Sequence, residues 1–408
     1  MSAPHTIERI MGDHVTINGD ADESFGSVAD AFTRNFSRHG EIGAALAVYQ
    51  GDRKVVDLWA GHRDRKRELP WERDTIVPCF SSSKGMSALA IAVAVSAGLL
   101  DYDKRVADYW PEFAANGKQD VTVRQLIDHQ AGLSGLDVKL RLDDLSDLDR
   151  LANTIAAQKP AWKPGARHGY HAISLGFYQS ELIRRVDPAH RTLGRYFADE
   201  IAAPLGLDFF IGLPDDVSMD RVAELSATRG LDIARYERDL PLRIGFDLLR
   251  KDGHAYRALT NPNIGKPERA ARRRFLAPEI PSTNGVGNAR SLARAYGAAA
   301  TGSADLPITS GVRDRLAEPG CNGGVPAYDL VLHTNSRYHL GFRKSSPAFA
   351  FGSPDHRAYG TTGLGGSFGF ADPTTGIGFG YVMNRLGLAI LDDVRSRNLR
   401  NAVFRALG

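Results

Sequence analysis

The chain has 408 residues, of which 43% are hydrophobic and 24% are charged, and its 51 basic and 48 acidic side chains give a formal net charge of +3. A chain of this length commonly folds into two lobes, and this composition is typical of a globular protein. A charge so close to neutral excludes the basic face that nucleic-acid binding requires, and the longest apolar run, residues 88–95, is far too short to span a bilayer.

Cysteine and histidine spacing exclude several kinds of site. The two cysteines, Cys79 and Cys321, cannot build a disulfide framework and form no C-x-x-C pair. Cys79 lies close to Ser81, but its neighbours Pro78 and Phe80 favour a small buried thiol over a nucleophile. The 12 histidines show no metal-ligand spacing, and no glycine loop is followed by Lys-Ser/Thr, so we expect neither a metal nor another cofactor. The N-terminus lacks the apolar core of a secretory signal, so we expect a cytoplasmic protein.

The first part of the chain predicts a helix, two strands and a second helix, in that order. Apolar side chains recur at helical spacing over residues 25–38. Residues 43–49 and 55–59 read as two strands joined by a tight turn. A strongly apolar helix then begins near Ser81 and runs towards Gly98.

The middle of the chain differs from both ends. Residues 104–280 predict a largely helical and irregular segment with breakers such as Pro164-Gly165. Strands return near residues 367–371 and over residues 377–383, where large side chains alternate with glycine so that one face is mostly glycine. Residues 388–407 predict a final amphipathic helix.

Strands at both ends therefore enclose a helical middle. We predict an α/β (α+β) fold in which residues 1–103 and 281–408 build one antiparallel sheet flanked by helices. Residues 104–280 would form an inserted, mostly helical domain, with the active site in the cleft between the two parts.

The sequence Ser81-Ser82-Ser83-Lys84 places a serine three residues before a lysine at the start of a predicted helix. Residues i and i+3 share a helix face, so the Lys84 side chain can reach Ser81 Oγ, whereas Ser82 and Ser83 point elsewhere. Lysine can accept a serine proton if burial or a positive dipole lowers its pKa, and the helix N-terminus supplies such a dipole. The spacing indicates a catalytic pair, although a helix cap beside a surface lysine gives the same pattern.

Two further segments strengthen the catalytic interpretation. Tyr170 follows Gly169 and the Pro164-Gly165 turn, and a phenol can relay a proton between a serine and a leaving group. A lone tyrosine is more commonly packed in a core. Five glycines fall between Gly360 and Gly369 inclusive, a density that indicates close approach of the backbone to a ligand beside a strand.

These segments belong to a longer series of ordered blocks: the Ser-x-x-Lys helix, TVRQLIDHQAGLSGL at residues 122–136, Gly-Tyr-His-Ala at 169–172, PSTNGVGNARSLARAY at 281–296, and GGSFGFADP before the last strand. In this order they resemble the serine β-lactamase-related superfamily of class C type, and most of all the family VIII carboxylesterases. The resemblance runs over nearly the whole chain and implies the β-lactamase/penicillin-binding-protein-like fold.

The resemblance also implies roles for individual residues. Ser81 would be the acylated nucleophile, with Lys84 and Tyr170 as its acid–base partners. The backbone N–H groups of Ser81 and Leu364 would form the oxyanion hole. From its position in the helix-to-loop turn LIDHQAGL, we expect His129 to be structural.

The sequence departs from the lactamase pattern at two places that bear on substrate. The Tyr-x-Asn motif reads Tyr170-His171-Ala172, and the Lys-Thr-Gly motif reads Thr361-Thr362-Gly363. A lysine at position 361 would hold a substrate carboxylate by a charge-assisted bond, whereas threonine offers a neutral hydroxyl. We expect His171, Thr361, Thr362 and Gly363 to border the substrate and to favour neutral acyl esters over β-lactams and cell-wall peptides.

A second serine motif, Gly365-Gly366-Ser367-Phe368-Gly369, fits the G-x-S-x-G nucleophile elbow, but Ser367 leads into a predicted strand instead of a helix. The leading prediction is thus a cofactor-independent serine carboxylesterase that acts on a small-molecule, short-chain ester through an acyl-enzyme, with no nucleic-acid or membrane partner. A β-lactamase, D-aminopeptidase, DD-peptidase or acyltransferase on the same scaffold is the near alternative. A non-catalytic acyl-binding or sensor protein is the distant one.

Overall fold

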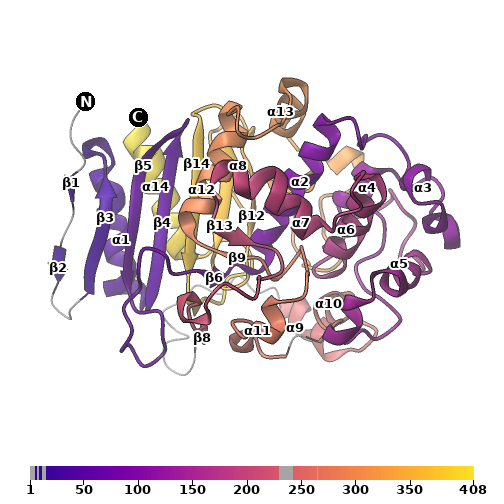
Figure 1. Ribbon diagram of the computed structural model, residues 1–408, viewed down its shortest axis with the longest axis horizontal. Helices are drawn as coiled ribbons and strands as arrows, with labels where there is room; N and C mark the ends of the chain where they lie inside the picture. Colours follow the sequence, from indigo (N-terminus) through magenta and orange to yellow (C-terminus); the bar gives the residue numbers. More distant parts are fainter. Residues whose placement is uncertain (1–4, 7–8, 12–14, 229–241, 264, 321) are drawn as a thin grey trace.

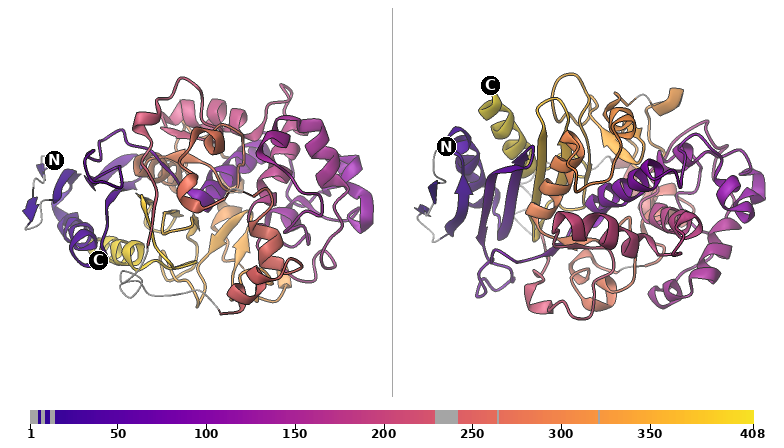
Figure 2. Two further views of the ribbon diagram at one scale, coloured as in Figure 1. Left: turned by 90° about the horizontal axis from the view of Figure 1, so that it is seen from below. Right: turned by 45° about the horizontal axis from the view of Figure 1, so that its top comes forward.

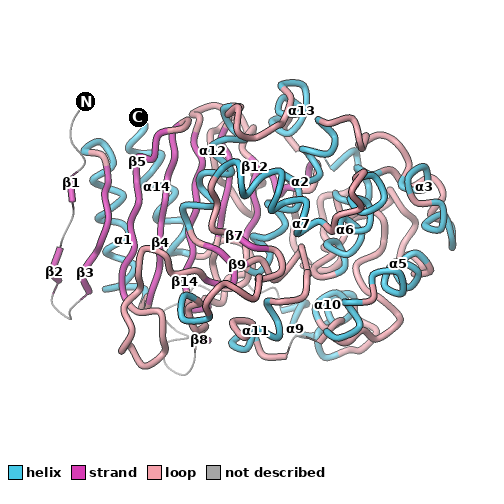
Figure 3. Tube along the Cα trace, in the orientation of Figure 1, coloured by secondary structure: helices cyan, strands magenta, loops and turns pink. Residues whose placement is uncertain are grey.

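The computed structural model describes residues 5–6, 9–11, 15–228, 242–263, 265–320 and 322–408, so Cys321 lies outside the described residues. The large sheet lies on one side of the molecule, where helices also cover it, and the other side is mostly helical (Figure 1; Figure 3). The strands form a 10-stranded sheet in which every pairing is antiparallel. In spatial order it contains β1 (His5–Thr6), β3 (Val15–Ala21), β5 (Arg53–Gly61), β4 (Gly43–Gln50), β14 (Ile377–Met383), β13 (Phe368–Asp372), β12 (Tyr359–Thr362), β11 (Phe342–Lys344) and β10 (Tyr338–His339), with β2 (Arg9–Met11) paired to β3.

The two ends of the chain meet in the middle of this sheet. Strand β4 pairs with β14 from Gln50 opposite Ile377 to Ala44 opposite Met383. The prediction of one antiparallel sheet built from both ends of the chain is therefore confirmed.

Glycine on β14 allows a helix to lie directly against the sheet. A Cβ atom added at Gly378 would lie 2.1 Å from Gly297 N, and one at Gly380 would lie 2.3 Å from Ala289 O, both in α12 (Ala289–Thr301). No larger side chain fits there, which explains the glycine face that the sequence predicts. The opposite face carries large side chains, and Phe370 there stacks on Phe404 of α14 (Val394–Leu407).

Helix α14 begins later than residue 388, where the sequence pattern predicts it. Asp393 is its N-cap, and the Asp393 carboxylate accepts a hydrogen bond from the backbone N–H of Arg395 at 2.9 Å. A capping carboxylate starts a helix wherever it satisfies the first free N–H groups, so the apolar pattern upstream does not extend the helix. Helix α1 (Gly26–His39) packs beside α14 (Figure 2).

Short helices form the other side of the molecule (Figure 2). They are α3 (Val106–Tyr109), α4 (Val123–Ile127), α5 (Leu148–Ala156), α6 (Ser174–Val186), α7 (Leu193–Phe197), α8 (Ala203–Leu205), α9 (Leu242–Leu249), α10 (His254–Leu259), α11 (Arg273–Leu276) and α13 (Ser310–Ala317). Two small sheets tie this side to the rest: β6 (Val77–Pro78), β9 (Val286–Gly287) and β7 (Phe209–Phe210) in one, and β8 (Ser226–Ala227) with β15 (Arg385–Leu386) in the other. Within the described residues, no helix has the length and apolar character needed to cross a bilayer.

Helix α2 (Ser83–Ser96) runs through the core between these two sides. All its residues from 83 to 94 are buried, which matches the uninterrupted apolar run in the sequence. A helix that is apolar all round is stable only when surrounded by protein. Its N-terminus, preceded by a single 3₁₀ turn at Phe80–Ser82, is therefore held rigidly, and this is where Ser81 lies.

Candidate active site

A strained and well-anchored turn presents Ser81. Phe80 has a φ of 47°, a left-handed conformation that is costly for a residue with a bulky side chain. The surroundings hold it: Cys79 N donates to Gly285 O at 2.8 Å, and Ser83 Oγ donates to Phe80 O while accepting from Gly285 N. Strain of this kind persists only where neighbouring contacts fix the backbone, and here it turns Ser81 into a cavity.

Lys84 lies deep beside Ser81, with 2% of its surface exposed. Its Nζ donates to the carbonyl oxygens of Ala172 at 2.7 Å and Ser282 at 2.8 Å, and lies 3.3 Å from Ser81 Oγ. A neutral amine has two N–H groups and one lone pair. With both N–H groups bound to carbonyls, the lone pair is left for the Ser81 hydroxyl.

The protonation state of Lys84 follows from its surroundings. Burial lowers the pKa of Lys84 well below its ordinary value, and the nearby Arg343 cation lowers it further. No carboxylate is ion-paired with Lys84 among the described residues. The neutral form of Lys84, which can accept a proton from serine, is therefore favoured far more than in an exposed lysine.

Tyr170 completes the group. Its hydroxyl hydrogen-bonds to Ser81, and Lys84 Nζ lies 4.6 Å from the centre of its ring. Burial raises the pKa of Tyr170 to about 12, against the lowering effects of the Ser81 hydrogen bond and of Arg343. The phenol therefore keeps its proton at neutral pH, so the geometry favours Lys84 as the base and Tyr170 as the proton donor.

Tyr170 is held by a buried network behind it. The Tyr170 N–H donates to Asp329 Oδ1 at 3.1 Å, and Tyr338 donates to Asp329 Oδ2 at 3.2 Å. The rings of Tyr170 and Tyr338 are stacked at 6.2 Å, and Arg343 donates to the Tyr338 hydroxyl at 3.0 Å. His129 lies at the edge of the same cluster, 5.0 Å from the Tyr170 ring, and accepts a hydrogen bond from His171 N. These contacts fix the phenol's direction.

Residues 363–366, in the hairpin loop between β12 and β13, border Ser81 on the other side. A Cβ atom at Gly363 would lie 2.1 Å from Cys79 O, so only glycine allows the loop to approach the nucleophile turn this closely. Gly363 N donates to Ser367 O at 2.8 Å, and Gly366 N to Gly363 O at 3.1 Å. Among the described residues, no backbone carbonyl accepts a hydrogen bond from the Leu364 N–H. Leu364 is 46% exposed and lines the cavity.

The cavity in front of Ser81 has a volume of about 210 Å³. Its polar lining consists of Ser81, Tyr170, Arg343 and Thr362. The rest of its wall is apolar: Ile244, Leu248, Leu259, Leu332, Leu364, Ile390 and Leu391. Such a pocket, apolar with a few convergent polar groups, suits a small acyl or alkyl group.

Two predicted substrate contacts, Thr361 and His171, face away from this cavity. Side chains alternate along a strand, so Thr362 lines the cavity while Thr361 points back to α2. The Thr361 hydroxyl accepts from Gly85 N at 3.1 Å and donates to Ser82 O at 3.0 Å.

His171 is fully buried. Its Nδ1 bonds to Gly169 O at 2.7 Å, and its Nε2 accepts from Leu133 N at 2.9 Å. Burial lowers the pKa of His171 to about 3, so the ring is neutral and both nitrogens are occupied by backbone. Backbone groups therefore occupy the polar atoms of both side chains, which act as structural supports here, and a contact between either residue and substrate stays a prediction.

Ser367 and Cys79, which the sequence analysis set aside as nucleophiles, are both buried away from the cavity. Ser367 is 1% exposed, donates to Cys79 O at 2.9 Å and lies 3.1 Å from Ser82 Oγ, so it joins β13 to the nucleophile turn. Cys79 is fully buried, and burial raises the pKa of its thiol to about 12.

Sequence reasoning missed Arg343 and the two carbonyls that hold Lys84. Arg343 comes from β11, is 4% exposed, and lies in a segment that no motif marks. Every residue has a backbone carbonyl, so the sequence does not show which carbonyls bind Lys84. One of the two, that of Ser282, does lie in the family block at 281–296. Among the described residues, no three His, Cys, Asp or Glu side chains gather as a metal site would require.

Comparisons with known proteins agree with this geometry. The sequence model of the Beta-lactamase family matches residues 28–404. The chain is 36% identical over 373 residues to the Esterase/beta-lactamase LipL of Mycobacterium tuberculosis, covering 90% of this chain and 83% of that protein.

Solved structures give the same result. A family VIII carboxylesterase superposes with a TM-score of 0.84 at 36% identity, covering 96% of this chain and 99% of the other. A penicillin-binding protein homologue from Caulobacter crescentus superposes with a TM-score of 0.82 at 36% identity, with the same coverage of 96% and 99%. The fold and family predictions are therefore confirmed: the chain belongs to the beta-lactamase family and is a serine hydrolase of that fold.

Proposed function

We propose that this protein is a carboxylesterase that hydrolyses neutral, short-chain acyl esters through a covalent acyl-Ser81 intermediate. The observation that carries the proposal is the position of Lys84. This side chain is buried, its Nζ donates hydrogen bonds to two backbone carbonyls, and it lies 3.3 Å from Ser81 Oγ. A lysine so placed is a base and not an anchor for a substrate anion.

Acylation follows from the protonation states. Lys84 takes the Ser81 proton as Oγ attacks the ester carbonyl carbon, and the carbonyl oxygen becomes an oxyanion. The backbone N–H groups of Ser81 and Leu364 are the donors we assign to that oxyanion, each of which typically contributes about 3 kcal/mol. Tyr170 then gives its proton to the departing alcohol oxygen, and the Lys84 proton passes to Tyr170.

Deacylation reverses these steps with water in place of the alcohol. Water attacks the acyl carbon, its proton passes through Tyr170 to Lys84, and the Ser81 oxygen leaves. Lys84 returns the proton to Ser81, so the acid is released and the enzyme regains its starting state.

The substrate class rests on the cavity wall. Its largely apolar lining suits an uncharged acyl chain, and the Arg343 guanidinium that also lines it is only 4% exposed and already donates to Ser336 and Tyr338. A family VIII carboxylesterase among the similar structures supports the same class.

A β-lactamase is the second candidate, favoured by the likeness to a protein called an esterase/beta-lactamase. Intact-protein mass spectrometry distinguishes the two. After exposure to p-nitrophenyl butyrate, we expect a short-lived butyryl adduct on the wild type and none on Ser81→Ala. Nitrocefin should give little adduct and little turnover.

Ser81→Ala should lower p-nitrophenyl butyrate turnover by several orders of magnitude. Ser367→Ala is the matched control, because Ser367 is also a serine beside the site but lies buried behind it. If Ser81→Ala remained active and Ser367→Ala were inactive, Ser81 would not be the nucleophile. If nitrocefin were hydrolysed as efficiently as the ester, the lactamase assignment would replace ours.

A further inference from the structure

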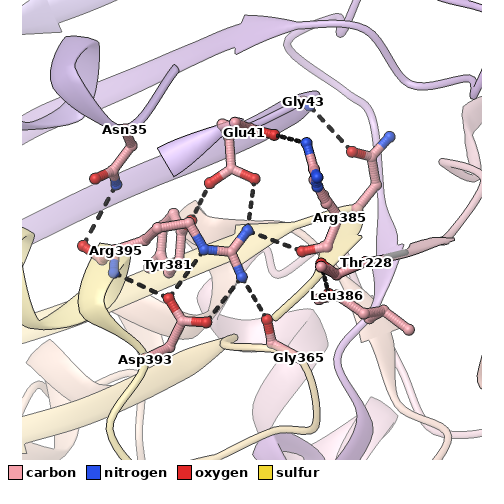
Figure 4. Close-up of polar contacts among 12 residues, drawn as sticks. Asn35, Glu41, Gly43, Thr228, Gly365, Tyr381, Arg385, Leu386, Asp393 and Arg395 are labelled. Atoms are coloured by element: carbon pink, nitrogen blue, oxygen red, sulfur yellow. Dashed lines mark hydrogen bonds and ion pairs between the residues drawn. The ribbon is translucent and has the colours of Figure 1, made fainter. Parts of the chain in front are cut away.

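Arg395, in the first turn of α14, is the centre of a buried polar cluster behind the site (Figure 4). It is fully buried, and all five guanidinium N–H groups have acceptors. Nε and one terminal nitrogen donate to the Asp393 carboxylate, each at 2.9 Å. The other terminal nitrogen donates to Glu41 at 2.9 Å and to Arg385 O at 2.8 Å. The remaining N–H donates to Gly365 O at 2.6 Å.

This last contact reaches the loop at residues 363–366, whose outer side carries Leu364 at the cavity. The Gly365 carbonyl also accepts from Gly387 N at 2.8 Å, so its inner side is fixed from two directions. A Cβ atom at Gly366 would lie 2.8 Å from Asp393 Oδ2 and 3.0 Å from the Arg395 guanidinium. The cluster therefore touches the loop directly, with no intervening side chain.

The loop needs an external anchor. Gly365 and Gly366 have φ angles of 89° and 120°, a region that glycine alone visits readily. Glycine has little conformational preference of its own, so the two residues do not fix the direction of the Leu364 N–H.

The charged composition of the cluster also indicates that it fixes the positions of the segments around it more than it stabilises the fold. A buried ion pair is seldom more stabilising than apolar side chains of similar volume, because desolvation offsets the attraction. Here the guanidinium joins its own helix N-cap, Asp393, to three other segments, at Glu41, Gly365 and Arg385 (Figure 4). Its planar fork sets their relative positions, which apolar packing would leave free to shift.

We propose that Arg395 is a positioning residue that holds the 363–366 loop so that the Leu364 N–H points at the oxyanion of the reacting ester. This inference rests on the proposed function, since it requires an oxyanion to form at Ser81. Arg395 acts through the loop backbone and does not touch substrate.

The test compares Arg395→Lys with Arg400→Lys in the full-length protein. Lysine keeps the charge but cannot reproduce five donors in a fixed plane. Arg400 is the matched control: it lies on the same helix, is 3% exposed, and pairs with Asp392 at 2.7 Å. None of its hydrogen bonds among the described residues reaches the loop.

We expect Arg395→Lys to lower kcat for p-nitrophenyl butyrate about 100-fold, as loss of an aligned oxyanion donor does, with KM changed less than about threefold. Arg400→Lys should keep kcat within about threefold, even where its thermal unfolding midpoint falls equally. If the two variants lose kcat in parallel, or neither does, Arg395 is only structural and the inference is wrong.

If Arg395→Lys does not fold, Asp393→Asn is measured against the same criterion. Asparagine still caps a helix but withdraws the charge that orients two N–H groups of Arg395. Ser81→Ala tests the proposed function separately from the role of Arg395. If Ser81→Ala is active, the proposed function is wrong. If Ser81→Ala is inactive and Arg395→Lys is fully active, only the role of Arg395 is wrong.

Discussion

Thr361→Val tests whether position 361 supports the nucleophile helix or selects the substrate. Valine has nearly the shape of threonine, so the change removes the hydroxyl without opening a cavity. The hydroxyl accepts from Gly85 N at 3.1 Å, donates to Ser82 O at 3.0 Å and lies 3.2 Å from the Tyr296 hydroxyl. All three partners belong to the wall behind Ser81.

The cost follows from what is left without a partner. The Gly85 N–H lies in the first turn of α2, where no intrahelical acceptor is available, and the Tyr296 hydroxyl is fully buried. Each buried donor left unsatisfied costs about 1–3 kcal/mol, so with two such donors Thr361→Val should destabilise the protein by about 2–6 kcal/mol. Because the lost bonds hold the turn that carries Ser81, kcat should fall as well.

Thr362→Val is the matched control on the same strand. Thr362 lines the cavity, and no side-chain hydrogen bond holds its hydroxyl among the described residues. We expect Thr362→Val to keep its denaturation midpoint and to alter KM. Chemical denaturation gives the stability of both variants, and p-nitrophenyl butyrate and nitrocefin give their substrate preference.

The reasoning would be refuted by the opposite pattern. If Thr361→Val kept its stability but changed the ratio of kcat/KM for the two substrates, Thr361 would face the substrate after all. The space around the Thr361 side chain is also small: a Cβ atom added at Gly85 would lie only 2.7 Å from Thr361 Oγ1. A lysine side chain at position 361, which is much longer than threonine, would not fit there.

Three further predictions concern the Lys84 proton. Wild-type activity should fall as pH drops through the lowered pKa of Lys84, and Lys84→Arg should be inactive at every pH because guanidinium keeps its proton. Arg343→Gln removes a cation that lowers the pKa of Lys84, so the acid limb of the pH–rate profile should move to higher pH. Arg343→Lys keeps the cation and should leave the limb in place. An unmoved limb in Arg343→Gln would contradict this role. Lys84→Met should flatten the pH dependence of stability between the lowered pKa of Lys84 and about pH 10, the ordinary lysine pKa, as measured by denaturation at several pH values.

The fold was largely predictable because its two strongest signals are periodic. The alternation over residues 377–383 gave β14, and the glycine face on it required a closely packed helix, which is α12. The start of α14 was not predictable from the apolar pattern, because the cap at Asp393 depends on which carboxylate reaches the free N–H groups.

The site was predictable only in part. Spacing on a helix brings Ser81 and Lys84 together, and the order of the blocks brings Tyr170 to them. Which face of a strand meets the cavity depends on register: one residue separates Thr361, which supports α2, from Thr362, which lines the cavity. Arg343 arrives from β11, and no local pattern in its own segment connects it with Ser81.

Burial of Lys84 links stability and catalysis through one equilibrium. Its folded pKa is lowered, so between that value and about 10.4 the unfolded chain binds a proton that the folded chain does not. The free energy of unfolding therefore rises with pH across this window, and the stability lost to burying the lysine is greatest below the folded pKa. The same window is the one in which Lys84 is neutral and can take the Ser81 proton. A change that exposed α2 to water would relieve the stability cost, but it would also return the lysine to its ammonium form and remove the base.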